Sequence, residues 1–385
     1  MINGLSLFAN VGIAETYLKR VGVDIVVANE LLPDRANFYK HLYSDCKMIQ
    51  GDITNQEVFN DIVASAKKSN VEFIIATPPC QGMSTAGKKL KDDIRNTLIV
   101  YVVYIIKRIK PKYVLIENVP AILHTKICID GEWVLINDYL KGELGSMYAF
   151  NDNKIINAMN YGVPQSRERC IYLLSRNDVK VQWEFPMQYA KICTMRDAIG
   201  DLPSLDPNVT DISKDELYEL FPDYEKKRKL GEKVSKWHYP PKHKIRHVVA
   251  MMKTPEGKSA WENSEYYPKL SNGLKSKGYR NTYKRQWWDR PAYTVTKYTS
   301  RLGSQENGHP GRPIVESNAE QDRIWSDARV LTIFELIRIM SLPDNWNIPD
   351  WASSNLIREV IGEGIPPKLI ENIVGELGLL NEEQK

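Results

Sequence analysis

Short apolar runs separated by helical stretches mark the chain from residue 5 to about 175. The runs read LSLFA, DIVVANE, KMIQGD, EFIIAT, KYVLIEN and RCIYLLS. The segments FIIA and YVLI are apolar at every position, which is typical of strands covered by helices on both faces. Strands that alternate with helices predict an α/β fold built on a doubly wound, mostly parallel sheet.

The pattern changes after Pro186, where prolines become frequent and the apolar periodicity weakens. Helical periodicity returns near the end in LTIFELIRIMSLP and PPKLIENIVGEL. A chain of 385 residues is longer than one small core requires, so the change predicts two domains. We expect a first domain over 1–190, completed by 345–385, and a smaller second domain over 191–344.

The composition, with 43% apolar and 26% charged residues, is that of a soluble globular protein. The longest apolar run, Leu98 to Ile106, is far shorter than the ~20 residues that span a bilayer. The segment from Met1 to Arg20 lacks the order of a signal peptide, so we expect a cytoplasmic protein with no membrane partner. Five cysteines without a C-x-x-C pair indicate neither a disulfide framework nor a zinc site, and we expect no metal.

Positive charge is concentrated in the second domain, although the net charge of the chain is only +4. Residues 226–247 hold nine Lys or Arg and three His against one acid, and residues 275–301 interleave basic residues with tyrosines and tryptophans. Such mixtures suit phosphate contact and base stacking, with Lys242 and Lys244 as candidates for the phosphate contact. A solvated loop region is the alternative interpretation of the same charges.

Polar residues follow the predicted strands at their carboxyl ends, where ligands collect in a doubly wound sheet. Gly12 follows the first strand, and Glu30 lies 18 residues later at the end of the second. A helix amino end at this turn can hold a negative group while Glu30 binds two ribose hydroxyls, although a tight structural turn is an alternative. Asp52, after the third strand, either accepts a hydrogen bond from an adenine amino group or caps the helix after Thr54. Together these residues favour an adenosine-containing cofactor.

A candidate nucleophile and a candidate acid follow the fourth and fifth strands. The fourth run ends in TPPCQGMS, where two prolines set a rigid turn that presents Cys80, and the fifth ends in IENVP with Glu117. Neighbouring parallel strands bring both residues to one edge of the sheet, which suggests a nucleophile with an acid partner. Arg167 and Arg169, in YGVPQSRERCIYL, occupy alternate strand positions and share a face suited to polar atoms of a base or a phosphate.

The motifs PPCQ, ENV and Q-x-R-x-R, in this order after a glycine-bearing first turn, resemble the motif series of the DNA cytosine-5 methyltransferases. Further matches are D-x-R at Asp93 to Arg95, RVLTIFELIRIMSLPDNW at 329–346 and GEGIPPKLI at 362–370. The resemblance implies a Rossmann-like methyltransferase domain, with a target recognition domain inserted as the second domain. It implies that a methyl group moves from S-adenosyl-L-methionine to carbon 5 of a flipped cytosine in a specific double-stranded DNA site, through a covalent adduct of Cys80.

Carried over position by position, the resemblance implies a role for each motif residue. Glu117 would protonate nitrogen 3 of cytosine, Arg169 would contact its carbonyl group, and Arg167 would help to hold the ring. The implied cofactor contacts are Phe8, Ala9, Asn10, Val11, Gly12, Ile13, Glu30, Leu31, Asp52, Ile53, Pro78, Leu98, Glu363 and Ile365. The expected DNA contacts are Gln81, Ser84, Arg95 and Gln165, beside Lys242 and Lys244.

Three residues depart from the family's pattern. Asn10 and Ile13 stand where the first turn usually has glycines, and Glu363 stands where the final motif usually has asparagine. Asparagine tolerates a left-handed backbone, whereas Ile13 narrows the space of the turn. An acid near the methionine carboxylate of the cofactor would repel it, so we expect Glu363 to point elsewhere and cofactor binding to be weakened.

Three other functions compete with this interpretation. A tRNA methyltransferase of related design shares PPCQ and ENV, but the sequence lacks the CFT-type segment of such enzymes. A non-catalytic DNA-binding relative fits the three departures but leaves the retained catalytic motifs unexplained, and a nicotinamide oxidoreductase explains only the first turn and Glu30. We expect a monomer whose partners are double-stranded DNA and, in a restriction-modification pair, a cognate restriction endonuclease. The recognised DNA site does not follow from composition.

Overall fold

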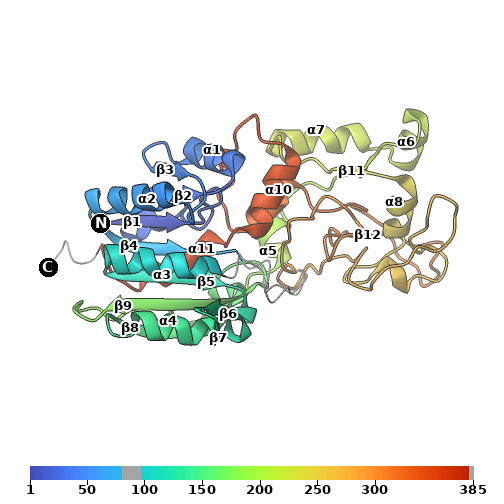
Figure 1. Cartoon of the computed structure of the whole chain (residues 1–385). Coiled ribbons are helices and arrows are strands. Elements are labelled where there is room, and N and C mark those ends of the chain that lie inside the picture. The colour runs from blue at the N-terminus through green and yellow to red at the C-terminus, as the bar shows by residue number, and fades with distance from the viewer. Residues whose placement is uncertain (80–96, 381–385) are drawn as a thin grey trace.

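The computed structural model describes residues 1–79 and 97–380, apart from the side chains of residues 152 and 153. In this part of the chain seven strands form one sheet in the order β3-β2-β1-β4-β5-β9-β8 (Figure 1). The strands are β1 (Ile2–Leu7), β2 (Val23–Glu30), β3 (Lys47–Gln50), β4 (Val71–Ala76), β5 (Tyr113–Asn118), β8 (Tyr148–Asn157) and β9 (Glu168–Arg176). Strands β1 to β5 run parallel, whereas β9 is antiparallel to both β5 and β8. The predicted α/β fold with a doubly wound, mostly parallel sheet is therefore confirmed, and the strand order reverses between β1 and β4, where such sheets bind ligands.

Strand β8 is the one strand of this sheet that the apolar pattern does not predict. Four polar residues at 151–154 interrupt its alternation. Its pairing with β9 shifts register between Asn151 and Lys154. An irregularity of this kind breaks the period of two by which a strand is recognised in a sequence.

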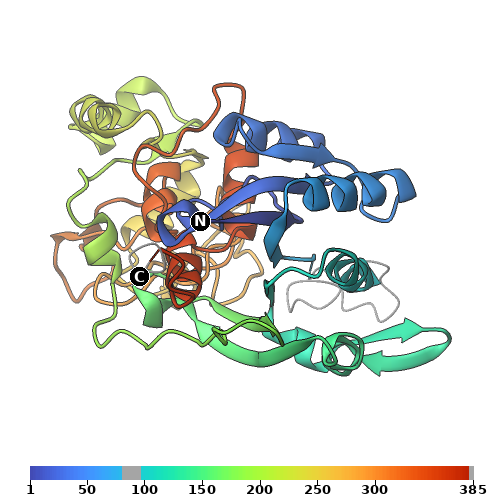
Figure 2. The same cartoon turned by 90° about the vertical axis from the view of Figure 1, so that its left-hand side faces the viewer.

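Helices cover both faces of the sheet (Figure 2). One face carries α2 (Gln56–Lys68), α3 (Leu98–Ile109) and α4 (Ile136–Leu144), and α3 is the buried helix expected from its apolar run. The other face carries α11 (Pro367–Gly375) and the segment around Trp183. Because successive side chains of a strand point to opposite faces, Ile74 belongs to the first core and its neighbour Ile75 to the second.

The remaining elements complete this part of the molecule. They are η1 (Leu18–Val21), α1 (Pro33–Leu42), η3 (Pro120–His124), η4 (Ala158–Tyr161), and a hairpin of β6 (Lys126–Ile129) and β7 (Glu132–Leu135). Helix α2 begins after Asn55, whose side chain accepts a hydrogen bond from the backbone N–H of Glu57 at 2.8 Å.

Residues 191–363 build a second lobe beside the sheet (Figure 1). Its elements are α5 (Met195–Ile199), β10 (Asn208–Val209), α6 (Lys214–Leu220), α7 (Tyr224–Val234), β11 (Lys242–His243), α8 (Ile245–Met252), η5 (Ala260–Glu262), β12 (Pro313–Val315), β13 (Ile324–Trp325), α9 (Ile333–Ile339) and α10 (Ser354–Glu363). One core lies within this lobe and includes Val248 and Val330. Another joins α5, α9 and α10 to Val11, Ile13 and Phe38 of the sheet side. Since α5 and α9 pack against the first turn of the sheet, the division at residues 190 and 345 stays a prediction.

A buried ion network anchors the start of α9. The guanidinium of Arg329, which is 0% exposed, donates to both carboxylate oxygens of Glu335 at 2.9 Å and to Asp327 at 2.8 Å. Thr332 caps the helix, since its hydroxyl accepts from the N–H of Glu335 and its own N–H donates to the Glu335 carboxylate. The motif RVLTIFE thus encodes a helix start whose buried charges are paired with one another.

Within residues 1–79 and 97–380, no helix combines the length and the apolar composition that crossing a membrane requires. The same residues contain no group of three or more His, Cys, Asp and Glu side chains placed to hold a metal ion.

Candidate active site

The first turn after β1 has an unusual backbone. Phe8, Asn10 and Gly12 adopt positive φ angles of 59°, 52° and 79°. A Cβ atom at Gly12 would lie 2.3 Å from the ring of Tyr43, whose hydroxyl donates to the Gly12 carbonyl at 2.6 Å. Gly12 is therefore required at this position, and Asn10 takes the left-handed conformation expected of it.

The carboxylate of Glu30 braces this turn from the end of β2. One of its oxygens accepts the N–H of Asn10 and the other accepts the N–H of Leu32, both at 2.9 Å. The side chain is buried, and this burial raises its pKa above the ordinary value of 4.5. Each carboxylate oxygen keeps a further lone pair, so the group can brace the turn and still accept from a ligand hydroxyl.

Asn10 and Ile13, the two residues of the first turn that depart from the family's pattern, contact α10 and the connection between α10 and α11. The amide nitrogen of Asn10 donates to the Val360 carbonyl at 3.3 Å, while its buried amide oxygen has no hydrogen-bond partner among the described residues. Ile13 is buried in the core between the lobes, and a Cβ atom at Gly364 would lie 2.8 Å from its Cδ1 atom. The side chain of Ile13 therefore fits because Gly364, which faces it, has no side chain. The amide oxygen of Asn10 is a buried hydrogen-bond acceptor beside the turn.

The remaining predicted cofactor residues line the same edge of the sheet. Ala9, Val11, Ile53, Pro78 and Ile365 are buried, Leu98 is half-buried at the start of α3, and Leu31 is 52% exposed. Asp52 is exposed and accepts the N–H of Thr54 at 2.9 Å. Since Asn55 caps α2, the alternative that Asp52 is the cap of that helix is wrong, and its second carboxylate oxygen is left for another donor.

An ion pair connects the carboxyl end of β5 to the start of β9. Arg169 Nε lies 2.7 Å from a carboxylate oxygen of Glu117, which is 7% exposed. Burial raises the pKa of the Glu117 carboxyl, and the charges of Arg169 and Arg167 oppose that increase. An acid in this setting takes up a proton more readily than an exposed glutamate, while Arg169 holds its orientation.

Asn118, the residue after Glu117, connects β5 to the end of β4. Its amide donates to the carbonyl of Pro78 at 3.0 Å, and its oxygen accepts the N–H of Val119 at 2.9 Å. The sequence offers this asparagine only as part of the ENV motif, without a role of its own. The predicted site residues Cys80, Gln81, Ser84 and Arg95 lie outside the described residues.

Gln165 and Arg167 are placed differently from their predicted roles. Gln165 is fully buried, where its amide oxygen accepts from the N–H of Val295 at 3.1 Å. Arg167 is 2% exposed and donates to the carbonyls of Val295 at 2.9 Å and Gly362 at 3.0 Å. The side chains are buried because residues 164–166 pair with residues 292–294 of the second lobe, through backbone bonds such as that from Ser166 to Ala292 at 2.8 Å.

These positions correct two expectations. Gln165 has no exposed surface for DNA in this structure, and the guanidinium of Arg167 joins three chain segments instead of sharing an open face with Arg169. Lys242 in β11 and Lys244 before α8 are exposed on the second lobe, as a phosphate contact requires.

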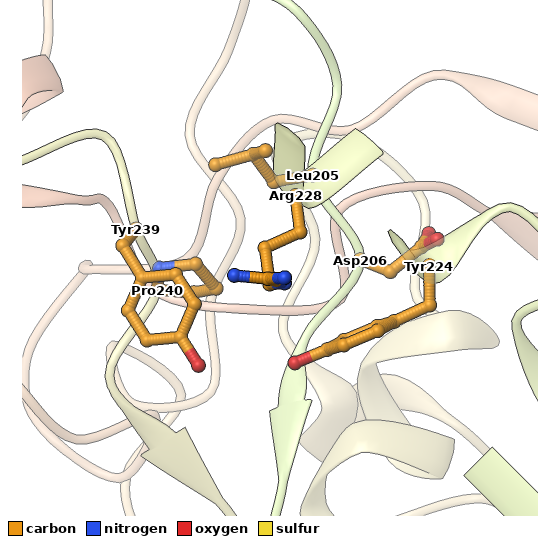
Figure 3. Close-up of a pocket in the computed structure, with 6 residues that line it drawn as sticks. All are labelled: Leu205, Asp206, Tyr224, Arg228, Tyr239 and Pro240. Carbon is orange, nitrogen blue, oxygen red and sulfur yellow. The ribbon is translucent and has the colours of Figure 1, made fainter. Parts of the chain in front are cut away.

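The second lobe contains a small cavity (Figure 3). Leu205, Asp206, Tyr224, Arg228, Tyr239 and Pro240 line it. Figure 3 shows the Arg228 guanidinium between the rings of Tyr224 and Tyr239. The cavity has a volume of about 10 Å³, which matches a single water molecule. It is therefore too small for a nucleotide or a base.

Comparison with known proteins assigns a family to this arrangement. A family model described as C-5 cytosine-specific DNA methylase matches residues 2–379. The chain is 44% identical over 381 residues to Type II methyltransferase M1.HgaI of Avibacterium volantium, covering 98% of each chain. It is 27% identical over 371 residues to Type II methyltransferase M.Eco47II of Escherichia coli, covering 95% of this chain and 76% of that one.

Solved structures share the fold over nearly the whole chain. A putative DNA modification methyltransferase encoded within an E. coli prophage superposes with a TM-score of 0.68 at 21% identity, covering 99% of this chain and 100% of that one. The Dnmt2 methyltransferase of S. pombe superposes with a TM-score of 0.56 at 16% identity, covering 100% of both chains.

Proposed function

The chain belongs to the C-5 cytosine-specific DNA methylase family and uses S-adenosyl-L-methionine to methylate DNA, and from this premise we propose that Cys80 adds covalently to a cytosine flipped out of a double-stranded site. The observation that carries the proposal is the buried Glu117–Arg169 pair at the ligand edge of the sheet, in a chain that matches the family over residues 2–379. A base stacked in a duplex is out of reach of such an edge, and flipping it out costs a few kcal/mol.

The proposed reaction distributes its steps among these residues. The Cys80 thiolate forms a bond to carbon 6, and the electrons of the 5,6 double bond make carbon 5 nucleophilic. Glu117 donates a proton to nitrogen 3, which its raised pKa favours, and Arg169 offsets charge at the neighbouring carbonyl oxygen. After methyl transfer a water removes the proton from carbon 5, the double bond re-forms as the Cys80 thiolate leaves, and nitrogen 3 returns its proton to Glu117.

The first turn and the strand ends fit the cofactor. When bound, S-adenosyl-L-methionine supplies an electrophilic methyl group. We assign its ribose hydroxyls to Glu30, its adenine amino group to Asp52, and a polar hydrogen to the buried acceptor oxygen of Asn10. Arg167 is then a positioning residue. It binds the carbonyls of Val295 and Gly362 in the second lobe, and it stands two residues before Arg169 in the chain.

Alanine at Glu30 or Asp52 should weaken cofactor binding. Each lost hydrogen bond costs roughly 0.5–3 kcal/mol, and Glu30→Ala should have the larger effect because Glu30 also braces the backbone of the turn. Calorimetric titration with S-adenosyl-L-homocysteine measures the affinity, and circular dichroism checks that the variants fold. Unchanged affinity in both folded variants would show that the turn is only structural.

The second lobe is proposed to read the DNA sequence. Replacing Lys242 or Lys244 by glutamine should weaken binding to every duplex and reduce the slope of log affinity against log salt by about one unit each. Lys67→Gln, at the end of α2 remote from the predicted ligand edge, is the matched control and should leave the slope as it is. An identical slope in the Lys242 and Lys244 variants would exclude these lysines as phosphate contacts.

Exchanging residues 191–328 for those of a relative should transfer site specificity, since base contacts specify and phosphate contacts only position. The exchange ends before Arg329 and so keeps that residue, Thr332 and Glu335. A folded hybrid that methylates the original site would place specificity elsewhere.

Bisulfite sequencing of DNA from a methylation-free bacterial host that expresses the chain tests the proposed function. Methylated cytosines in one recurring sequence are expected, and their absence would contradict the assignment. We further propose that the protein acts as a monomer and protects DNA against a cognate restriction endonuclease, since the relatives are named Type II methyltransferases.

A further inference from the structure

An ion pair lies beside the proposed cofactor turn and involves the acid that departs from the family's pattern. Glu363 ends α10, and one of its carboxylate oxygens lies 2.7 Å from Arg35 Nη2 in the first turn of α1. Both side chains are largely buried, at 17% exposure for Arg35 and 27% for Glu363. The other oxygen of Glu363 lies 3.9 Å from Lys297 Nζ, which is a looser contact from the second lobe.

Several contacts place this ion pair against the first turn. Asn10 donates to the carbonyl of Val360, less than one helical turn before Glu363, and Gly364 packs against Ile13. On the α1 side, the Glu30 carboxylate accepts the N–H of Leu32, the residue before α1 begins. The positive charge of Arg35 also lowers the pKa of Glu30 against the effect of burial. Arg35 is therefore paired with Glu363 on one side of the turn, and its charge also acts on Glu30 on the other side.

The cofactor carries a carboxylate of its own on its methionine part. Lys297 also faces Glu363, but at 3.9 Å its contact is looser than that of Arg35. Removing Arg35 would therefore leave the carboxylates of Glu30 and Glu363 less well neutralised and would expose an incoming anion to their charge. An uncharged asparagine at position 363, the usual residue of the family, would need no such counter-charge. The acid at 363 and the arginine at 35 thus form a matched pair in this chain.

We propose that Arg35 is a positioning residue for the cofactor, which neutralises Glu363 and holds its carboxylate away from the carboxylate of bound S-adenosyl-L-methionine. The proposal rests on the cofactor site proposed above. It assigns the effect to charge, and not to a mechanical connection between α1 and α10. The two explanations differ in their consequences, because a mechanical connection fails whichever partner is removed, whereas a charge effect is relieved when the acid is removed as well.

The test compares Arg35→Met, Glu363→Gln and the double variant by calorimetric titration with two ligands. S-adenosyl-L-homocysteine carries the carboxylate, and 5′-methylthioadenosine lacks the whole amino-acid part. Arg35→Met should bind S-adenosyl-L-homocysteine about tenfold more weakly than the natural protein, whereas the double variant should recover to within about threefold. All variants should bind 5′-methylthioadenosine with the same affinity.

Two further variants serve as controls. Arg35→Lys keeps the charge and should bind S-adenosyl-L-homocysteine nearly as the natural protein does, which also covers the case that Arg35→Met does not fold. Lys297→Met removes the looser contact to Glu363 and should change the affinity by less than about twofold. A thermal unfolding curve for each variant separates lost binding from lost structure.

The outcomes are distinct. If the double variant binds as weakly as Arg35→Met, or if 5′-methylthioadenosine is weakened equally, the contact is mechanical and the proposal is overturned. The proposal is also overturned if Arg35→Met binds S-adenosyl-L-homocysteine as the natural protein does. If the natural protein itself fails to bind S-adenosyl-L-homocysteine, the proposed cofactor site fails, and the inference fails with it.

Discussion

A Cys80→Ser variant should lose methyl transfer while it still binds S-adenosyl-L-homocysteine and DNA. The reason is chemical, since a serine hydroxyl is far less nucleophilic than a thiolate and cannot add to carbon 6 of cytosine at a useful rate. Transfer of a labelled methyl group to duplex DNA measures the loss. Cys128→Ser is the matched control, because Cys128 is an exposed free cysteine on β6, and it should keep full activity.

Covalent trapping gives the same prediction a second, independent measurement. In the presence of S-adenosyl-L-methionine, DNA that contains 5-fluorocytosine at the target should form an adduct with the natural protein that survives denaturation, because after methyl transfer the fluorine at carbon 5 cannot leave as a proton does. The adduct should be absent from Cys80→Ser and present in Cys128→Ser. Methyl transfer by Cys80→Ser, or an adduct in that variant, would refute the covalent mechanism.

Replacing Arg329 by methionine should destabilise the protein by about 3–5 kcal/mol, the usual cost of removing one partner from a buried ion pair. The change leaves Asp327 and Glu335 buried without the guanidinium that both now share, and it weakens the capping of α9. Urea unfolding measures the free energy. Arg196→Met is the control, because Arg196 pairs with Asp289 at an exposed site, where an ion pair contributes roughly 0.2–1 kcal/mol.

The same network predicts how stability depends on pH. Burial alone would raise the pKa of Glu335, but Arg329 together with His309 lowers it from the ordinary 4.5 to about 2. A carboxyl group with a lowered pKa stabilises the folded state fully above its unfolded value, and this contribution is lost as the pH falls from about 4.5 to about 2. The Arg329→Met variant should show a weaker dependence in this interval. Equal stability of Arg329→Met and Arg196→Met would contradict the assigned role of the network.

The sequence alone determines the strands and the residues at their ends. Apolar runs such as FIIA and YVLI identify strands because side-chain period and burial are local properties, and the ends of those strands locate Glu30, Asp52 and Glu117 at one edge. The motif order in the same sequence identifies the family, which the match over residues 2–379 confirms. The missed strand β8 shows the limit of this reasoning, since polar residues at 151–154 conceal its period.

Only the tertiary structure decides which polar side chains are free to act. Arg167 and Arg169 stand two positions apart, yet the first is buried against the carbonyls of Val295 and Gly362 while the second pairs with Glu117. The partners of Arg167 lie 128 and 195 residues away in the chain, so no local sequence pattern predicts them. Glu363 and its partner Arg35 lie still farther apart in the sequence, and their pairing also depends on how α10 packs against the first turn. Strand periodicity is encoded by neighbours along the chain, whereas the partners of a charge are chosen by the packing of segments that the sequence keeps far apart.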